Sequence, residues 1–212
     1  QAYYPYLTLD ENQSVYTLMF AGFGRDGIYR ILTRESTAPD TFSISTQIIR
    51  FSWNFPVCGM FSGRFGTNDF LWYSTKEEDT QPDAIYWSVK DINVDTYPSG
   101  IKIISPEPGN FDSQGIEFPY VVSVSSGYYM YYSCSDGVKW CIGLAFSEDA
   151  INWVKFSSPV LEPGEAWEQN IVKGSCVLFD GEVFEMFYFG DNGIGYARSM
   201  DGIHWEKYPG NP

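Results

Sequence analysis

The sequence predicts an all-β protein, a β-propeller of four-stranded antiparallel blades with four repeats visible, either four-bladed or an incomplete five-bladed ring. Three observations support this prediction. A pattern of about fifty-five residues occurs four times. Each copy divides into short strand-like segments separated by turn residues. The composition, with 18% aromatic residues, 20 Gly and 12 Pro, is typical of many strands joined by tight turns.

The third and fourth copies of the pattern agree best. Residues 141–153 return as residues 193–205 at an offset of 52, with Ile-Gly-x-Ala followed by Ser-x-Asp-(Gly/Ala)-x-x-Trp. Four isoleucines mark equivalent positions, and the steps between them are 57, 57 and 52 residues: Ile28, Ile85, Ile142 and Ile194. A repeat of this length indicates propeller blades. We place them in one domain, 1–212, at about 1–53, 54–113, 114–168 and 169–212.

The first two copies have the same order of elements with weaker endings. In the first, the expected strands are 4–9, 15–20, 27–31 and 41–51. In the second, they are 58–61, 70–74, 84–88 and 101–104. The second strand of each copy is rich in aromatic residues, which favours a strand.

The last two copies contain clearer turns. The third is expected to form strands at 118–124, 128–133, 141–146 and 154–157, with an Asp-Gly turn after the second. The fourth is expected at 175–179, 183–189 and 194–198, with a short last strand after Trp205. Alternating apolar residues, as in 118–124, predict that one face of each strand is buried.

The Ser-x-Asp-(Gly/Ala)-x-x-Trp segment is expected to be architectural. Asp and Gly would close a tight turn between the third and fourth strands, and Trp would fill the gap between neighbouring blades. His204 lies inside this turn, and one histidine there is no basis for a metal site or a catalytic triad.

Charge restricts the class of partner. The chain has 27 acidic and 13 basic residues, a net charge of −14, which disfavours nucleic acid and anionic membrane surfaces. No apolar run approaches the length of a membrane span. A neutral oligosaccharide or polysaccharide is the expected partner, and no cofactor or metal is expected. The sequence does not determine the cellular compartment, although a secreted or periplasmic location is slightly favoured.

The four cysteines have no metal-like spacing. We interpret them as small buried or strand-edge thiols. A disulfide between Cys134 and Cys141, which flank a predicted hairpin loop, is the alternative.

The chain resembles the five-bladed propellers of glycoside hydrolase families 43 and 32. The resemblance rests on the aromatic second strand, the Ile-Gly-x-Ala third strand, the aspartate turn and the segment Ile116-Glu117-Phe118-Pro119. In that superfamily a Glu-x-Pro at this place supplies the general acid, so the resemblance implies this role for Glu117. It also implies aspartates at the first two blade entries. Here the matching positions are Tyr4-Pro5 and Cys58-Gly59, and the fourth blade offers Lys173-Gly174.

Glycosidic cleavage needs a carboxylic acid to protonate the leaving oxygen and an opposed carboxylate as base or nucleophile. A glutamate at the start of an innermost strand would point into the axial funnel, where burial and neighbouring carboxylates raise its pKa. The alternative for Glu117 is a hydrogen bond to backbone at the channel mouth, without chemistry.

Other candidate site residues come from loops and crossings expected at the same mouth. Trp140 and Trp167 would suit stacking on a sugar ring, with packing between blades as the alternative. Asp26, Asp83 and Glu168 are candidates for the base and for binding sugar hydroxyls, and Tyr4 lies at the first entry.

Three functions remain open from the sequence. The first is a glycosidase with Glu117 as general acid. The second is a non-catalytic carbohydrate-binding or scaffolding propeller that has lost the catalytic aspartates. The third is a designed or truncated blade array, in which four repeats assemble or dimerise to complete a ring.

Overall fold

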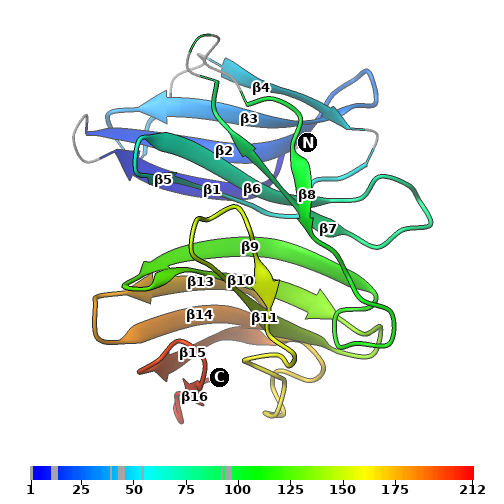
Figure 1. Cartoon of the computed structure of the whole chain (residues 1–212), viewed down its shortest axis with the longest axis vertical. Coiled ribbons are helices and arrows are strands. Elements are labelled where there is room, and N and C mark those ends of the chain that lie inside the picture. The colour runs from blue at the N-terminus through cyan, green and yellow to red at the C-terminus, as the bar shows by residue number, and fades with distance from the viewer. Residues whose placement is uncertain are drawn as a thin grey trace.

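The computed structural model describes residues 2–10, 14–38, 40–42, 46–53, 55–91, 93 and 97–212, and the side chains of all of these except residues 2–4, 10 and 46–53. The described residues form four sheets, each of four consecutive strands, arranged as the blades of a β-propeller (Figure 1). The predicted fold class is confirmed. No helix with the length and apolar character of a membrane span occurs in this described part.

Each blade is a simple antiparallel meander. The first contains β1 (Ala2–Asp10), β2 (Val15–Phe23), β3 (Tyr29–Ser36) and β4 (Thr46–Trp53). The second contains β5 (Met60–Phe65), β6 (Asn68–Thr75), β7 (Ala84–Val89) and β8 (Ile101–Ile104). The third contains β9 (Gly115–Val124), β10 (Gly127–Ser135), β11 (Trp140–Ser147) and β12 (Val154–Lys155). The fourth contains β13 (Lys173–Phe179), β14 (Phe184–Gly190), β15 (Gly193–Ser199) and β16 (Glu206–Lys207).

Side-chain alternation gives each blade two faces. We call the face toward the preceding blade the near face and the face toward the following blade the far face. In β10, Met130 and Tyr132 pack against the second blade, whereas Tyr131 between them packs against the fourth. This arrangement follows from the period of two in a strand, which sends successive side chains to opposite faces.

Three apolar cores separate the four blades, and in each one a far face packs on the next near face. The first core joins Met19, Ala21 and Ile31 to Leu71, Tyr73 and Tyr86. The second joins Trp72 and Ile85 to Met130 and Tyr132. The third joins Tyr131, Ile142 and Leu144 to Met186, Tyr188 and Ala197.

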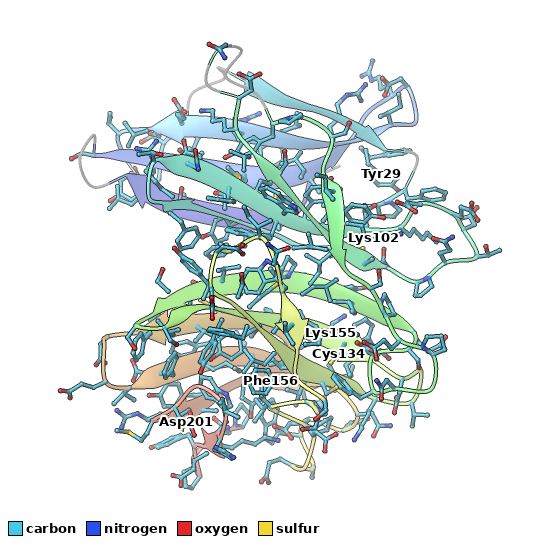
Figure 2. The ribbon with its side chains drawn as sticks, in the orientation of Figure 1. Tyr29, Lys102, Cys134, Lys155, Phe156 and Asp201 are labelled. Atoms are coloured by element: carbon cyan, nitrogen blue, oxygen red, sulfur yellow. The ribbon has the colours of Figure 1, made fainter. Side chains whose placement is uncertain are left out.

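The aspartate turns have the architectural role that the sequence predicted. The Asp201 carboxylate accepts hydrogen bonds from the backbone N–H groups of Ile203 and His204, both at 2.8 Å. The indole Nε1 of Trp205 donates to the carbonyl of Gly202 at 3.1 Å. Figure 2 shows Asp201 in the fourth blade, at the opposite end of the molecule from Tyr29 of the first.

The tryptophan that ends each aspartate turn packs against the preceding blade. The ring centroid of Trp153 lies 6.5 Å from that of Trp72 in the second blade, nearly perpendicular to it. The ring centroid of Trp205 lies 5.7 Å from that of Tyr131 in the third blade. Each turn therefore fixes its own blade and contributes to the core beside it.

The four cysteines, all of them described, form no disulfide. Cys134 and Cys141 are directly paired across β10 and β11, with their Sγ atoms 2.9 Å apart in the buried core. Cys58 is half-buried and Cys176 is exposed.

Candidate functional site

A β-bulge near the start of the first strand aligns the entries of three blades. The register shifts at equivalent places, between Tyr3 and Tyr6, between Glu117 and Tyr120, and between Lys173 and Cys176. Bulges re-aim side chains at strand ends. The register makes Tyr3, rather than Tyr4, the equivalent of Glu117, and the side chain of Tyr4 lies outside the described residues.

Backbone hydrogen bonds to the second blade hold Glu117 in place. The amide on either side of it donates across the blade boundary: Ile116 N–H to the carbonyl of Asp83 at 3.0 Å, and Phe118 N–H to the carbonyl of Cys58 at 3.2 Å. These bonds come from the main chain, so they position the side chain of Glu117 without consuming its carboxyl oxygens.

The chain turns sharply beside Glu117. Phe118 has a φ of 52°, in the left-handed region that non-glycine residues rarely adopt. Gly59, with a φ of 87°, lies directly against it, and a Cβ at Gly59 would come within 2.7 Å of Phe118 Cα. Glycine is therefore required where the second blade meets this entry.

Three potential ligand groups converge at this point. The polar side-chain atoms of Cys58, Asp83 and Glu117 all lie within 4.8 Å of one another, and all three residues are half-buried. Burial raises the pKa of Glu117 to about 7, with Lys173 opposing the rise and Asp83 adding to it. Burial also raises the pKa of Asp83, against the opposing charge of Lys76.

Thiol and carboxyl groups in this arrangement are of the kinds that coordinate divalent cations. Lys173 already places a positive charge close enough to lower the pKa of Glu117. We therefore assign no metal to Cys58, Asp83 and Glu117.

Lys173 joins the site through two aromatic rings. Its Nζ lies 4.5 Å from the ring centroid of Trp140 and 5.6 Å from that of Phe118. Both distances are within the range of cation–π attraction. Trp140 thus belongs to the same cluster as Glu117, and one face of its indole carries the ammonium group of Lys173.

Trp167, the other predicted stacking residue, lies on the crossing between the third and fourth blades and packs against the fourth. Its ring centroid lies 5.9 Å from that of Tyr188. A Cβ at Gly190 or Gly195 would come within 2.3 Å or 2.7 Å of the indole, so these two glycines make space for it. Much of the Trp167 surface is therefore occupied by the fourth blade.

Glu168 is fully buried and has four internal partners. Its carboxylate accepts hydrogen bonds from Lys207 Nζ at 2.6 Å and from the Tyr188 hydroxyl at 2.8 Å. It also accepts hydrogen bonds from the backbone N–H groups of Gly164 and Glu165, at 2.8 and 2.9 Å. Burial alone would raise the pKa of Glu168, but these partners outweigh it and hold the pKa below its ordinary value. No exposed surface of this side chain is left to meet a glycan.

Asp26 lies on the exposed loop between β2 and β3. It is ion-paired with Arg30, whose Nη1 donates to Asp26 Oδ1 at 2.9 Å, and this partner lowers the pKa of Asp26 to about 2. The structure therefore brings Asp83 and Trp140 into the cluster around Glu117, whereas Asp26 and Glu168 are engaged elsewhere.

Sequence reasoning located Cys58 and Lys173 at blade entries but gave neither a role in the site. The missing information was the bulge register, which aligns Lys173 with Glu117, and the bond from Phe118 that brings Cys58 alongside. The sequence signal that could have pointed to Lys173 was a charged residue at the start of an otherwise apolar first strand.

No family model matches the chain. Among curated proteins, it is similar to an uncharacterized protein of Mycobacterium tuberculosis, at 29% identity over 126 residues. That match covers 57% of this chain and 36% of the mycobacterial protein.

Solved structures align with a larger share of the chain. The β-1,2-mannobiose phosphorylase of Listeria innocua aligns over 95% of this chain and 58% of its own, at a TM-score of 0.77 and 13% identity. A thermostable family-43 glycoside hydrolase aligns over 99% and 75%, at a TM-score of 0.77 and 17% identity. The chain has the fold of these carbohydrate-active propellers. An α-L-arabinofuranosidase of Lactobacillus brevis, aligned over 98% and 67% at a TM-score of 0.69 and 16% identity, shares it as well.

Proposed function

We propose that this chain is a carbohydrate-active propeller that hydrolyses a glycosidic bond with Glu117 as the general acid. The observation that carries the proposal is a half-buried carboxyl at a blade entry whose pKa burial raises to about 7. A general acid is most effective when its pKa lies near the working pH, because it is then both protonated and able to release its proton.

Asp83 supports this role through its charge. Its carboxylate lies within 4.8 Å of the carboxyl group of Glu117. Inverting glycosidases separate their two carboxyl groups by about 6.5–9.5 Å to admit a water. The shorter distance leaves no such space and is closer to the about 5–5.5 Å of retaining glycosidases, in which the second carboxylate is the nucleophile. We therefore assign Asp83 two roles: its charge helps to keep the proton on Glu117, and its carboxylate attacks the sugar to form a glycosyl-enzyme that water then hydrolyses.

Lys173 and Trp140 complete the proposed site. The ammonium group of Lys173 limits the rise in the pKa of Glu117, because it stabilises the carboxylate. Trp140 holds that ammonium over its ring at 4.5 Å, and we assign the half-buried indole to stacking on a sugar.

A non-catalytic carbohydrate-binding or scaffolding propeller is the second candidate. It is favoured by the engagement of the other two base candidates, since Asp26 is paired with Arg30 and Glu168 with Lys207. An acid without an opposed carboxylate would hold a glycan without cleaving it.

The test is turnover of aryl glycosides by the wild type and by Glu117→Gln. The panel includes mannosides and arabinofuranosides, the sugars named for two of the structural neighbours, with and without inorganic phosphate because one neighbour is a phosphorylase. For poor leaving groups, the substitution is expected to lower kcat/KM by about 10²–10⁴-fold. For dinitrophenyl glycosides, which leave without protonation, the loss should be much smaller.

Glu182→Gln is the matched control, since it removes one negative charge at an exposed turn of the fourth blade. It should leave kcat/KM unchanged. Equal activity of Glu117→Gln and wild type on every leaving group would refute the acid role. No turnover by either protein, with undiminished glycan binding by Glu117→Gln, would select the binding function.

A further inference from the structure

The third blade contains two cysteines that face each other across neighbouring strands. Cys134 of β10 is paired directly with Cys141 of β11, and their Sγ atoms are 2.9 Å apart. Each Sγ atom also lies near the backbone carbonyl of the other cysteine, at 3.2 Å and 3.5 Å. Figure 2 shows Cys134 within this blade. The S–S bond of a disulfide is about 2.05 Å long, so a shift of about 1 Å would bring the two sulfurs to bonding distance.

The backbone at this pair has the dimensions that a disulfide needs. The N–H group of Ile142 donates to Leu161, and its carbonyl accepts from Val160, so both groups point away from β10. Because these groups alternate in direction along a strand, those of Cys141 point toward β10 and make it a hydrogen-bonded pair with Cys134. The Cα atoms of such a pair are about 5.5 Å apart, within the range of about 4.4–6.8 Å found across disulfides.

The neighbouring blades show that the fold does not require cysteine at this place. In the register of the repeat, the equivalents of the cysteine pair are Thr75 opposite Ala84 in the second blade and Gly190 opposite Gly193 in the fourth. Small residues without sulfur therefore satisfy the packing here. Two facing thiols in the third blade need an explanation other than size.

The cysteine pair lies beside the backbone that positions the candidate acid. On its other side Cys134 is paired with Ile116 of β9, whose N–H group donates to the carbonyl of Asp83. Ile116 directly precedes Glu117 in the chain. A bond between the two sulfurs would therefore join β10 to β11 next to the segment that carries Glu117.

Both thiols are shielded from solvent. Cys134 and Cys141 are 0% exposed and belong to the core between the second and third blades. Burial raises the pKa of the Cys134 thiol, so the thiolate that attacks a disulfide is scarce in the folded protein. Reagents therefore reach the pair before the core closes, and the closed core protects a bond that has formed there.

We propose that Cys134 and Cys141 are an oxidation site, which closes as a cross-strand disulfide when the chain folds in the presence of a small-molecule disulfide such as oxidised glutathione. One cysteine thiolate attacks a sulfur of the oxidant and releases one molecule of glutathione. The other cysteine thiolate attacks the protein sulfur of the mixed disulfide and releases the second molecule. The two cysteines lose two protons and two electrons in all, and the oxidant gains them.

The expected consequence is a chain that is more stable after folding under oxidising conditions. The bond would close the hairpin loop from 134 to 141 and so restrict the unfolded chain. We expect the melting temperature of the oxidised protein to lie about 5–10 °C above that of the reduced protein.

The test compares two samples of the 212-residue chain refolded from denaturant, one with oxidised glutathione and one with reduced glutathione alone. Both are then denatured, alkylated and digested with trypsin, which cleaves after Lys139 and so separates the two cysteines. The first sample should yield peptides linked through Cys134 and Cys141, whereas the second should have every cysteine alkylated. Cys58 and Cys176 are internal controls, expected to be alkylated or to carry glutathione but not to be linked to another cysteine.

A double variant, Cys134→Thr with Cys141→Ala, copies the pair of the second blade and cannot form the bond. Its melting temperature should be the same after both refolding conditions. Oxidised glutathione added to wild-type protein that has already folded in the reduced form should produce the bond at least about tenfold more slowly than during refolding.

Three results would overturn the proposal. The first is complete alkylation of Cys134 and Cys141 after refolding with oxidised glutathione. The second is a bond from either of them to Cys58 or Cys176, because the strand register would then not select the partner. The third is equally fast oxidation of the folded protein, which would mean that the core does not shield the pair. These readings come from the wild type and do not depend on whether it cleaves a glycan, so they are independent of the proposed function.

Discussion

Glu117 owes its raised pKa to its place at the blade boundary. Burial is the largest cause of the rise in its pKa from the ordinary value of 4.5 to about 7, and Asp83 adds a smaller amount. The unfolded chain exposes this carboxyl to water and restores the ordinary value. Between these two pKa values the folded protein retains a proton that the unfolded chain releases, so the free energy of unfolding falls as pH rises through this window.

Glu117→Gln should therefore stabilise the protein in a pH-dependent way. Near pH 4 the variant and the wild type should have the same free energy of unfolding, because glutamine resembles the protonated acid. At about pH 8, above both pKa values, the variant should be more stable by roughly 3 kcal/mol. Urea unfolding at both pH values measures the difference. Glu182→Gln, at its exposed turn, should show no such dependence, and an equal effect of Glu117→Gln at both pH values would contradict the assignment.

At the scale of elements, the aspartate turns show how one motif adapts to its neighbour. Ala150 and Gly202 occupy the same place in two turns and share a left-handed backbone, with φ of 63° and 75°. Gly202 is constrained further, because the Tyr131 hydroxyl of the preceding blade donates to its carbonyl at 2.9 Å. A Cβ at Gly202 would come within 2.7 Å of that hydroxyl.

Gly202→Ala should thus cost more stability than the same change in an open turn. Gly66 is the matched control, since its φ is 63° and a Cβ there would meet nothing within 4 Å. We expect about 1 kcal/mol for Gly66→Ala from the backbone alone, and roughly 1–3 kcal/mol more for Gly202→Ala from overpacking. Chemical unfolding gives both values. Adding Tyr131→Phe should reduce the extra cost at Gly202, and equal costs at the two glycines would exclude the steric explanation.

The same scale explains what the sequence could predict. Strands and aspartate turns depend on residues close together in the chain, such as Ser199, Asp201 and Trp205, so their positions were predictable. The cluster around Glu117 depends on contacts between blades. Asp83 reaches it because its carbonyl accepts Ile116 N–H from 33 positions later (116 − 83), and no local pattern records such a bond. Glu168 was misleading for the same reason, because its partner Lys207 lies in a distant strand.

At the scale of the whole molecule, the net charge of −14 opposes folding, because the acidic residues repel one another more strongly in the compact chain than in the unfolded one. Ionic strength sets the size of this repulsion, since the Debye length falls from about 10 Å in 0.1 M salt to about 3 Å in 1 M salt.

The free energy of unfolding should consequently rise as NaCl is added. Between about 0.05 and 0.5 M NaCl, screening weakens the repulsion and leaves the apolar cores, so the midpoint of urea unfolding is expected to move to a higher urea concentration. A midpoint that falls with salt would mean that ion pairs such as Lys155–Asp112 and Lys207–Glu168 outweigh the repulsion.

The bulged entries have one more consequence. Their geometry is created by main-chain bonds, including those from Ile116 and Phe118 to the second blade, and not by the side chain that stands there. The same frame accordingly accepts a glutamate in the third blade and a lysine in the fourth. Mutation can exchange the reagent at an entry while the scaffold stays intact, so this architecture can acquire or lose chemistry one residue at a time.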